Sequence, residues 1–261
     1  WLVGYQEEIS VNSNNKHNNY TIHELTTNTI KHIFELANYP MALNSIHEKN
    51  EQSQEKYKMT GIFLSLVDNL ETKFKVMKKT SNALPHIFMI NNLSFIVTSL
   101  QKSRRELESF IPFKTIETID GFITTHLQQY THACWDRAIQ VTTLDVPIEY
   151  KKGDKLTDAT RKAIKKKFAE FNQILEENRQ CHDEIRITDD RILQAIKDYN
   201  KNQIVGRYKT FYEKYTALDF ATYRAKYIKY SVIDAQNIVD GFFTTVQQQT
   251  DYRVRPCSQL F

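Results

Sequence analysis

The sequence predicts an all-α protein. Only six glycines and five prolines occur in 261 residues, fewer than strand-and-turn architectures use at their turns. Apolar residues recur at steps of three and four along most of the chain, which is the period of an amphipathic helix. Capping patterns precede several of these stretches, and no stretch shows a convincing strand alternation. At this length the chain can form one elongated domain or two small ones with a sizeable core.

The first helix is predicted to begin at a capping box made by Thr21 and Glu24. In this pattern the hydroxyl and the carboxylate satisfy first-turn amides reciprocally. The helix is expected to stop after Tyr39, because Pro40 follows. The preceding residues, 1–19, end in a run of polar side chains that cannot bury apolar surface. We therefore expect a polar N-terminal segment outside the helical part.

Two further helices are predicted in the first half of the chain. Residues 55–79 carry apolar side chains on one side only, as expected of a long amphipathic helix. Residues 87–97 are apolar almost all round, which is typical of a helix in the middle of a bundle. Asn91 and Asn92 interrupt this apolar run, and their amides would need hydrogen-bond partners when buried.

The second half of the chain begins with a long predicted helix over residues 115–140. A cap at Thr157–Asp158 starts the next helix, and Ser231–Asp234 is a capping-type start for the last one, over residues 232–246. These signals divide the chain into the polar segment 1–19, a helical subdomain 20–141, a connecting loop 142–156, a C-terminal helical subdomain 157–246 with a basic surface, and an irregular tail 247–261.

The charge of the chain is concentrated in its C-terminal half. The net charge is only +4, but residues 151–167 hold eight Lys and Arg residues against two Asp residues. Such polarisation is expected of a protein that meets an anionic surface. Three widely separated cysteines indicate a reducing compartment rather than a disulfide framework. No apolar run is long enough to predict a membrane span.

Catalytic and metal-binding patterns are absent from the sequence. His23–Glu24 does not continue into the HExxH pattern, because residue 27 is Thr. Cys181, His182 and Asp183 are adjacent, whereas catalytic triads assemble in space, so we expect a solvated turn there. We predict a non-enzymatic protein with no catalytic residues, no metal site and no cofactor.

The candidate binding site is a basic and aromatic stretch, Tyr223–Tyr230. Lys226 and Lys229 are three residues apart and would be neighbours on a helix, beside Arg224. Such a cluster fits anionic lipid headgroups, and we favour lipid over nucleic acid because the aromatics are spaced like core residues. A solvated helix face is the alternative for Lys165–Lys167. The predicted further contributors are basic residues on neighbouring segments: Arg207, Lys209, Arg161, Lys162, Lys165, Lys166 and Lys167.

Several motifs together resemble one known family. They are His23–Thr26, the run 84–100, Phe168–Asn172 with 175–177 behind it, and Lys226–Tyr230. In this order and approximate spacing they resemble the C-terminal half of the seventy-kilodalton subunit of the exocyst. The resemblance extends from about Thr21 to Phe243.

The resemblance implies an elongated rod of stacked antiparallel helix pairs, the fold of tethering-complex subunits. It implies a non-enzymatic subunit that tethers secretory vesicles to the plasma membrane and binds phosphatidylinositol 4,5-bisphosphate, with Lys226 and Lys229 at the two lysine positions of the family's motif. The implied partners are other exocyst subunits, a Rho-family small GTPase, plasma-membrane phosphoinositides and, for some members, actin-nucleation machinery. The implied location is cytoplasmic, peripheral at the inner face of the plasma membrane.

Two features depart from the family's pattern. The turn from Ile185 to Thr188 lacks the aromatic residue expected before the next helix, and the chain continues past Phe243 with a Gln-rich tail that contains arginines. Two alternatives stay open: a helical-repeat scaffold that binds proteins without direct lipid contact, and a basic nucleic-acid-binding helical domain. The second is the less expected of the two, and we predict that nucleic acid is not a partner.

Overall fold

A computed structural model describes residues 20–39, 41, 59–103, 107, 111–182 and 185–245. The described part is mainly helical, with four two-residue strands. The helices are α1 Glu24–Ala37, α3 Met59–Met77, α4 Leu84–Lys102, α6 Phe113–Thr143, α7 Asp158–His182, α8 Asp190–Tyr199, the π-helix η3 Asn200–Val205, α9 Gly206–Thr216, the 3-10 helix η4 Arg224–Lys226 and α10 Val232–Asp240, and the strands are β1 Tyr150–Lys151, β2 Lys155–Leu156, β3 Arg186–Ile187 and β4 Thr244–Thr245.

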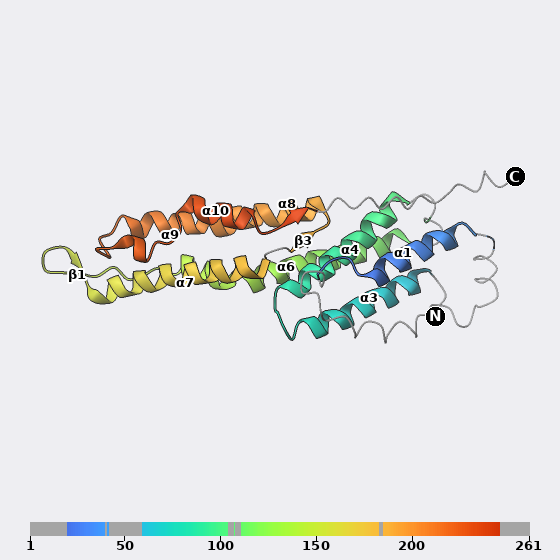
Figure 1. The fold of residues 1–261 in the computed structure, drawn as a ribbon, viewed down its shortest axis with the longest axis horizontal. Coiled ribbons are helices and arrows are strands. Elements are labelled where there is room, and N and C mark those ends of the chain that lie inside the picture. Colours follow the sequence, from blue (N-terminus) through green and yellow to red (C-terminus); the bar gives the residue numbers. More distant parts are fainter. Residues whose placement is uncertain are drawn as a thin grey trace. The chain divides into compact units, whose positions relative to one another are not determined.

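The described residues form two compact units. The first contains the described residues up to Tyr130 together with Ile187–Asp189, and the second contains the described residues of Thr131–Arg186 and Asp190–Thr245. This division falls inside α6, and the subdomain boundary predicted at 142–156 stays a prediction. Figure 1 shows α1, α3 and α4 packed together in the first unit, and α7 alongside α8, α9 and α10 in the second.

The first unit is built around α4, as the sequence predicted. Residues 84–97 of this helix are all buried. Asn91 and Asn92 find the partners that burial requires: the Asn92 Oδ1 accepts from the His23 backbone N–H at 2.8 Å, and the Asn91 Nδ2 donates to the Tyr20 carbonyl at 2.8 Å. The hydrogen bond between His23 and Asn92 also explains why the predicted start of the first helix was wrong. The N-cap of α1 is His23, whose Nδ1 accepts from the Leu25 N–H at 3.1 Å, and not the predicted Thr21.

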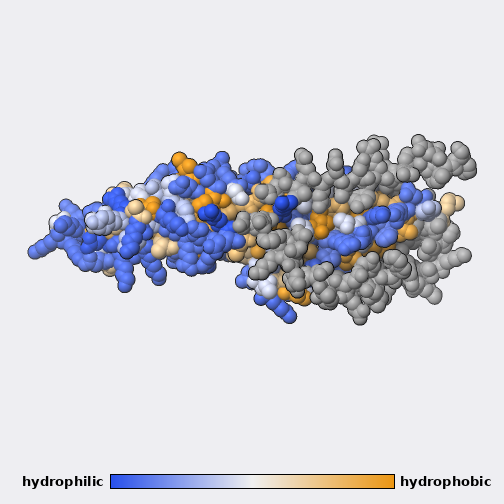
Figure 2. Space-filling model, viewed as in Figure 1, coloured by the Kyte–Doolittle hydropathy of each residue, from blue (hydrophilic) through white to orange (hydrophobic). Residues whose placement is uncertain are grey.

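The second unit has an aromatic core between α7 and α9. Four apolar residues of α7, spaced by three and four positions, are all buried: Ile164, Phe168, Phe171 and Leu175. The Phe171 ring stacks on Tyr208 at a centroid distance of 3.9 Å. The visible face of this unit is mostly hydrophilic, with few apolar side chains among the polar ones (Figure 2). The core therefore lies between the helices, which leaves their basic residues at the surface.

The last helix begins where predicted but ends earlier. Ser231 caps α10 in a capping box with Asp234, as the sequence indicated. The helix ends at Asp240, and the prediction that it continues to residue 246 was wrong. Phe242 leaves the helical path to stack on Trp135, at 5.8 Å between centroids with an interplanar angle of 5°. Burial of this aromatic pair outweighs continuation of the helix.

Candidate functional site

The basic stretch Tyr223–Tyr230 is not an α-helix. A short 3-10 helix, η4, is followed by an irregular segment that leads into the cap of α10. Two of its carbonyls make tertiary hydrogen bonds: Tyr227 accepts from the Asn172 Nδ2 at 2.8 Å, and Tyr230 accepts from the Tyr208 hydroxyl at 2.7 Å. The prediction that Lys226 and Lys229 are neighbours on a helix was therefore wrong, because tertiary bonds hold this backbone in another form.

Lys229 is engaged with a carboxylate of α7. Its Nζ lies 2.6 Å from the Glu176 Oε1, and the Tyr230 hydroxyl donates to the same oxygen. The hydrogen bond between the Lys229 and Glu176 side chains holds the pKa of Glu176 below its usual range and raises the pKa of Lys229. The charge of Lys229 is thus compensated within the protein, although its side chain remains 56% exposed.

Lys226 is the uncompensated lysine of this stretch. It is exposed and makes no ion pair with any residue that the structure describes. The next residue, Tyr227, lies against α7, with its ring 5.1 Å from the Lys165 Nζ. Consecutive Cα atoms are about 3.8 Å apart, so the backbones of Lys226 and Tyr227 lie together beside this part of α7.

Three lysines of α7 extend the same surface. Lys165 and Lys166 follow Lys162 by three and four residues, which places all three on one side of the helix. Lys162 and Lys166 are exposed, and among the residues that the structure describes none of the three pairs with a carboxylate. We define Lys162, Lys165, Lys166 and Lys226 as the lysine surface. It brings together positive charges from two segments that are distant in the sequence, an arrangement that attracts anions.

Two other predicted site residues serve the fold. The Arg224 guanidinium donates to the Thr216 carbonyl at the end of α9, at 2.9 Å, and lies 3.7 Å from Asp219. The Lys167 Nζ donates to the Val141 carbonyl at 2.7 Å, and burial lowers the pKa of this lysine. Both cations compensate the free carbonyls and the negative end of a helix.

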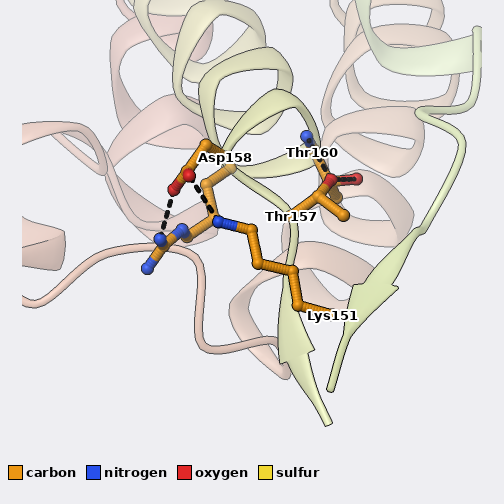
Figure 3. A network of polar contacts seen from close by, with 5 residues as sticks. Lys151, Thr157, Asp158 and Thr160 are labelled. Carbon is orange, nitrogen blue, oxygen red and sulfur yellow. Dashed lines mark hydrogen bonds and ion pairs between the residues drawn. The ribbon is translucent and has the colours of Figure 1, made fainter. Parts of the chain in front are cut away.

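The remaining predicted residues are also paired. Arg161 and Lys151 both bind the Asp158 carboxylate, and these hydrogen bonds lower the pKa of Asp158 to about 2 (Figure 3). Arg207 donates to Gln203 at 3.1 Å and to Thr143 at 3.4 Å, and Lys209 lies 3.9 Å from Glu213. Sequence position alone could not separate these paired residues from the lysine surface.

The histidine of the cysteine–histidine motif lies in the core, whereas Cys181 is exposed. His182 is 1% exposed and stacks on Phe242 at 4.9 Å, and its Nδ1 lies 2.6 Å from the Asn178 carbonyl oxygen. Because a carbonyl oxygen only accepts, the His182 Nδ1 carries the proton. Its Nε2 lies 3.8 Å from the buried Cys134 Sγ, and burial lowers the pKa of His182 to about 4. The expectation of a solvated turn was wrong for His182.

The described residues contain neither a metal-binding cluster nor a helix that could span a membrane. No cluster of three or more His, Cys, Asp or Glu side chains in the described ranges is arranged to hold a metal ion. None of the helices in those same ranges combines the length and the apolar character that crossing a bilayer requires.

The sequence is similar to that of known proteins. Residues 2–241 match the family model that describes the C-terminal part of the Exo70 exocyst complex subunit. The human protein named Exocyst complex component 7 is 27% identical over 239 residues, a match that covers 86% of this chain and 32% of the human protein. The Arabidopsis thaliana protein named Exocyst complex component EXO70A1 is 22% identical, with 85% and 36% covered. The chain thus spans about a third of the length of these curated relatives.

A solved structure of the yeast Saccharomyces cerevisiae Exo70 has a similar fold. The TM-score is 0.63 at 14% sequence identity, and the match covers 92% of this chain and 50% of the yeast chain. A second structure, of the exocyst subunit Exo70p, gives a TM-score of 0.64 at the same identity and covers 92% of this chain and 51% of that one. These matches confirm the predicted fold class.

Proposed function

The chain belongs to the family of Exo70 exocyst complex subunits, which it matches in their C-terminal part, and on that premise we propose that it is part of a non-enzymatic vesicle-tethering protein that binds the plasma membrane directly. The ligand is phosphatidylinositol 4,5-bisphosphate, held by the lysine surface. The partners are other exocyst subunits, a Rho-family small GTPase and actin-nucleation machinery. The protein works at the cytoplasmic face of the plasma membrane, as a peripheral protein.

One observation carries the lipid proposal. The lysine surface presents four cations from α7 and η4 without a carboxylate partner among the described residues, while three other predicted site residues, Lys229, Arg161 and Arg224, are paired with carboxylates. An anionic leaflet attracts each basic residue near it by about 1 kcal/mol. Four such residues together give a useful and reversible affinity, and a phosphorylated inositol concentrates several negative charges on one ligand.

The test compares two double variants that remove the same charge. Lys162→Ala/Lys226→Ala removes half of the lysine surface, whereas Lys31→Ala/Lys75→Ala removes two exposed lysines of the first unit. Sedimentation with vesicles that contain phosphatidylinositol 4,5-bisphosphate is measured at about 150 mM salt, where the Debye length is about 8 Å. At about 1 kcal/mol per residue, the first variant loses about thirtyfold in affinity.

The outcomes separate the proposal from its alternatives. Equal losses in both variants would show that binding depends on total charge and would reject the lysine surface. Absence of binding by the unmodified protein would favour a scaffold that binds only proteins. Retardation of RNA or DNA, with affinity falling steeply as the salt concentration rises, would favour the nucleic-acid alternative.

A further inference from the structure

Three large apolar side chains are exposed on the second unit close to the end of α9: Leu144 (56% exposed), Tyr150 (56%) and Tyr223 (79%). We call these three residues the apolar tip. Single exposed apolar residues are ordinary on protein surfaces. These three are unusual because residues near them in the chain contact one short stretch of α9, and because exposed lysines lie close in the sequence to both tyrosines.

Contacts with the last residues of α9 bring two parts of the tip together. The Asp145 carboxylate, next to Leu144, lies 2.5 Å from the Lys214 Nζ. Arg224, next to Tyr223, donates to the Thr216 carbonyl at 2.9 Å. The backbones beside Leu144 and Tyr223 are therefore both attached to residues 214–216.

The third side chain of the tip stands on a hairpin at the same end. The Val146 N–H donates to the Tyr215 hydroxyl at 2.8 Å, and Tyr150 follows four residues later, at most about 14 Å along the chain. In the hairpin, β1 pairs antiparallel with β2 and Tyr150 lies opposite Leu156. Leu156 is buried, whereas Tyr150 remains exposed beside it.

The hairpin is fixed to α7 rather than free. Lys151 of β1 reaches the Asp158 carboxylate at 2.5 Å, and the same carboxylate binds Arg161 (Figure 3). The turn uses positive φ angles at Gly153 (81°) and Asp154 (54°), a geometry that tight hairpin turns require. The backbone of Tyr150 is therefore held in place before any ligand binds, which reduces the conformational entropy lost on binding.

Exposed lysines lie close in the sequence to the two tyrosines of the tip. Lys152 and Lys155 flank the hairpin turn, and Lys226 follows Tyr223 by three residues; all three lysines are exposed, and none pairs with a carboxylate in the part of the chain that the structure describes. Lysine is depleted in the cores of protein–protein interfaces. Tyrosine and lysine together are instead typical of the membrane–water interface, where rings sit at headgroup depth and ammonium groups stay in water.

We propose that the apolar tip enters the interfacial layer of an anionic bilayer, with Tyr150 and Tyr223 at headgroup depth and Leu144 in the same layer. This inference rests on the proposed lipid binding by the neighbouring lysine surface and adds a contribution that salt does not screen. The lysine surface supplies the long-range attraction, and the tip supplies the short-range contact. The second unit then meets the membrane with the end that carries the hairpin.

The experiment places a fluorescent reporter at the tip. The chain has two tryptophans, of which Trp135 is fully buried. In a Trp1→Phe background, Tyr150→Trp and Tyr223→Trp are each mixed with vesicles that contain phosphatidylinositol 4,5-bisphosphate and brominated phosphatidylcholine. Quenching by bromine requires contact with the lipid. Tyr39→Trp is the matched control, because Tyr39 is 67% exposed and lies in the first unit.

The expected result is loss of fluorescence at positions 150 and 223 and none at position 39. A Tyr150→Ser/Tyr223→Ser variant is expected to bind more weakly while keeping the salt dependence of the unmodified protein, because no charge is removed. Sedimentation without quenching at either tip position would overturn this inference and leave the lipid proposal standing. Absence of sedimentation would overturn both, and equal quenching at position 39 would indicate non-specific adsorption and reject the tip.

Discussion

Replacing Asn92 with leucine tests whether a single buried amide holds the first unit together. The Asn92 Oδ1 accepts from the His23 backbone N–H at 2.8 Å and from the Thr26 hydroxyl at 2.6 Å. Its Nδ2 donates to the Thr21 carbonyl at 3.2 Å and to the Phe88 carbonyl at 2.8 Å. Leucine is similar in size but has no polar atom, so the substitution removes the bonds without opening a large cavity.

The magnitude follows from the groups that lose their partner. The His23 N–H and the Thr26 hydroxyl are both left without the acceptor that Asn92 supplies, and Thr26 is completely buried. An unsatisfied buried donor costs about 1–3 kcal/mol, so two cost about 2–6 kcal/mol. Burying a leucine side chain returns about 1.5–3 kcal/mol if it fits. We expect a net loss of about 2 kcal/mol in the free energy of unfolding.

The assay is urea unfolding followed by circular dichroism, with Asn69→Leu as the matched control. The Asn69 Nδ2 bonds to the Ser65 carbonyl of its own helix, at 2.8 Å, so its replacement is expected to cost less than about 0.5 kcal/mol. A loss for Asn92→Leu no larger than that of the control would refute the claim that this amide connects α4 to the start of α1. The slope of the transition should be unchanged, because the same surface is exposed on unfolding.

Two further predictions concern ionisable groups. Glu176→Gln removes the carboxylate that pairs with Lys229. In sedimentation, the affinity for vesicles containing phosphatidylinositol 4,5-bisphosphate is expected to rise about fivefold, which corresponds to about 1 kcal/mol for one basic residue near an anionic surface. Unchanged affinity would show that this carboxylate does not compete with phosphate for Lys229. The free energy of unfolding is expected to fall as the pH is lowered from about 6.5 to about 4, because burial lowers the pKa of His86 and His182 to about 4 in the folded state and the unfolded chain takes up their protons first. In urea titrations over this pH range, His182→Gln should make the free energy of unfolding fall less steeply with decreasing pH. His32→Gln, at an exposed position, should leave this dependence unchanged. Equal pH dependence in the two variants would contradict the assignment of the decline to His182.

The helices were predictable because their signals are local. The buried stripe of α7 follows from a spacing of three and four residues, and the capping box of Ser231 and Asp234 involves residues of one turn. The start of α1 was not predictable in the same way. Thr21 and Glu24 form a valid capping pattern, but the Asn92 side chain binds the His23 backbone from 69 residues away, and His23 becomes the cap.

The basic composition of the candidate site was predictable from the sequence, but the contacts between its residues were not. Basic residues crowd the C-terminal half, and this is visible in the sequence. The pairing of Lys229 with Glu176 joins residues 53 positions apart, and the contact of Lys165 with Tyr227 joins segments that are similarly distant. No periodicity encodes such contacts, because they depend on how α7 packs against the segment after α9. The prediction of a helix over Tyr223–Tyr230 was wrong for the same reason.

The partners of the basic residues decide how a variant can be interpreted. Lys229→Ala removes a cation and also leaves Glu176 as an uncompensated negative charge beside the Tyr230 hydroxyl. A loss of lipid binding in that variant would therefore mix a lost attraction with a new repulsion. Lys226→Ala removes a charge that has no carboxylate partner in the described residues, so its effect reports on the ligand alone. Of the two lysines in the motif, Lys226 is the one whose replacement isolates the contact with an anion.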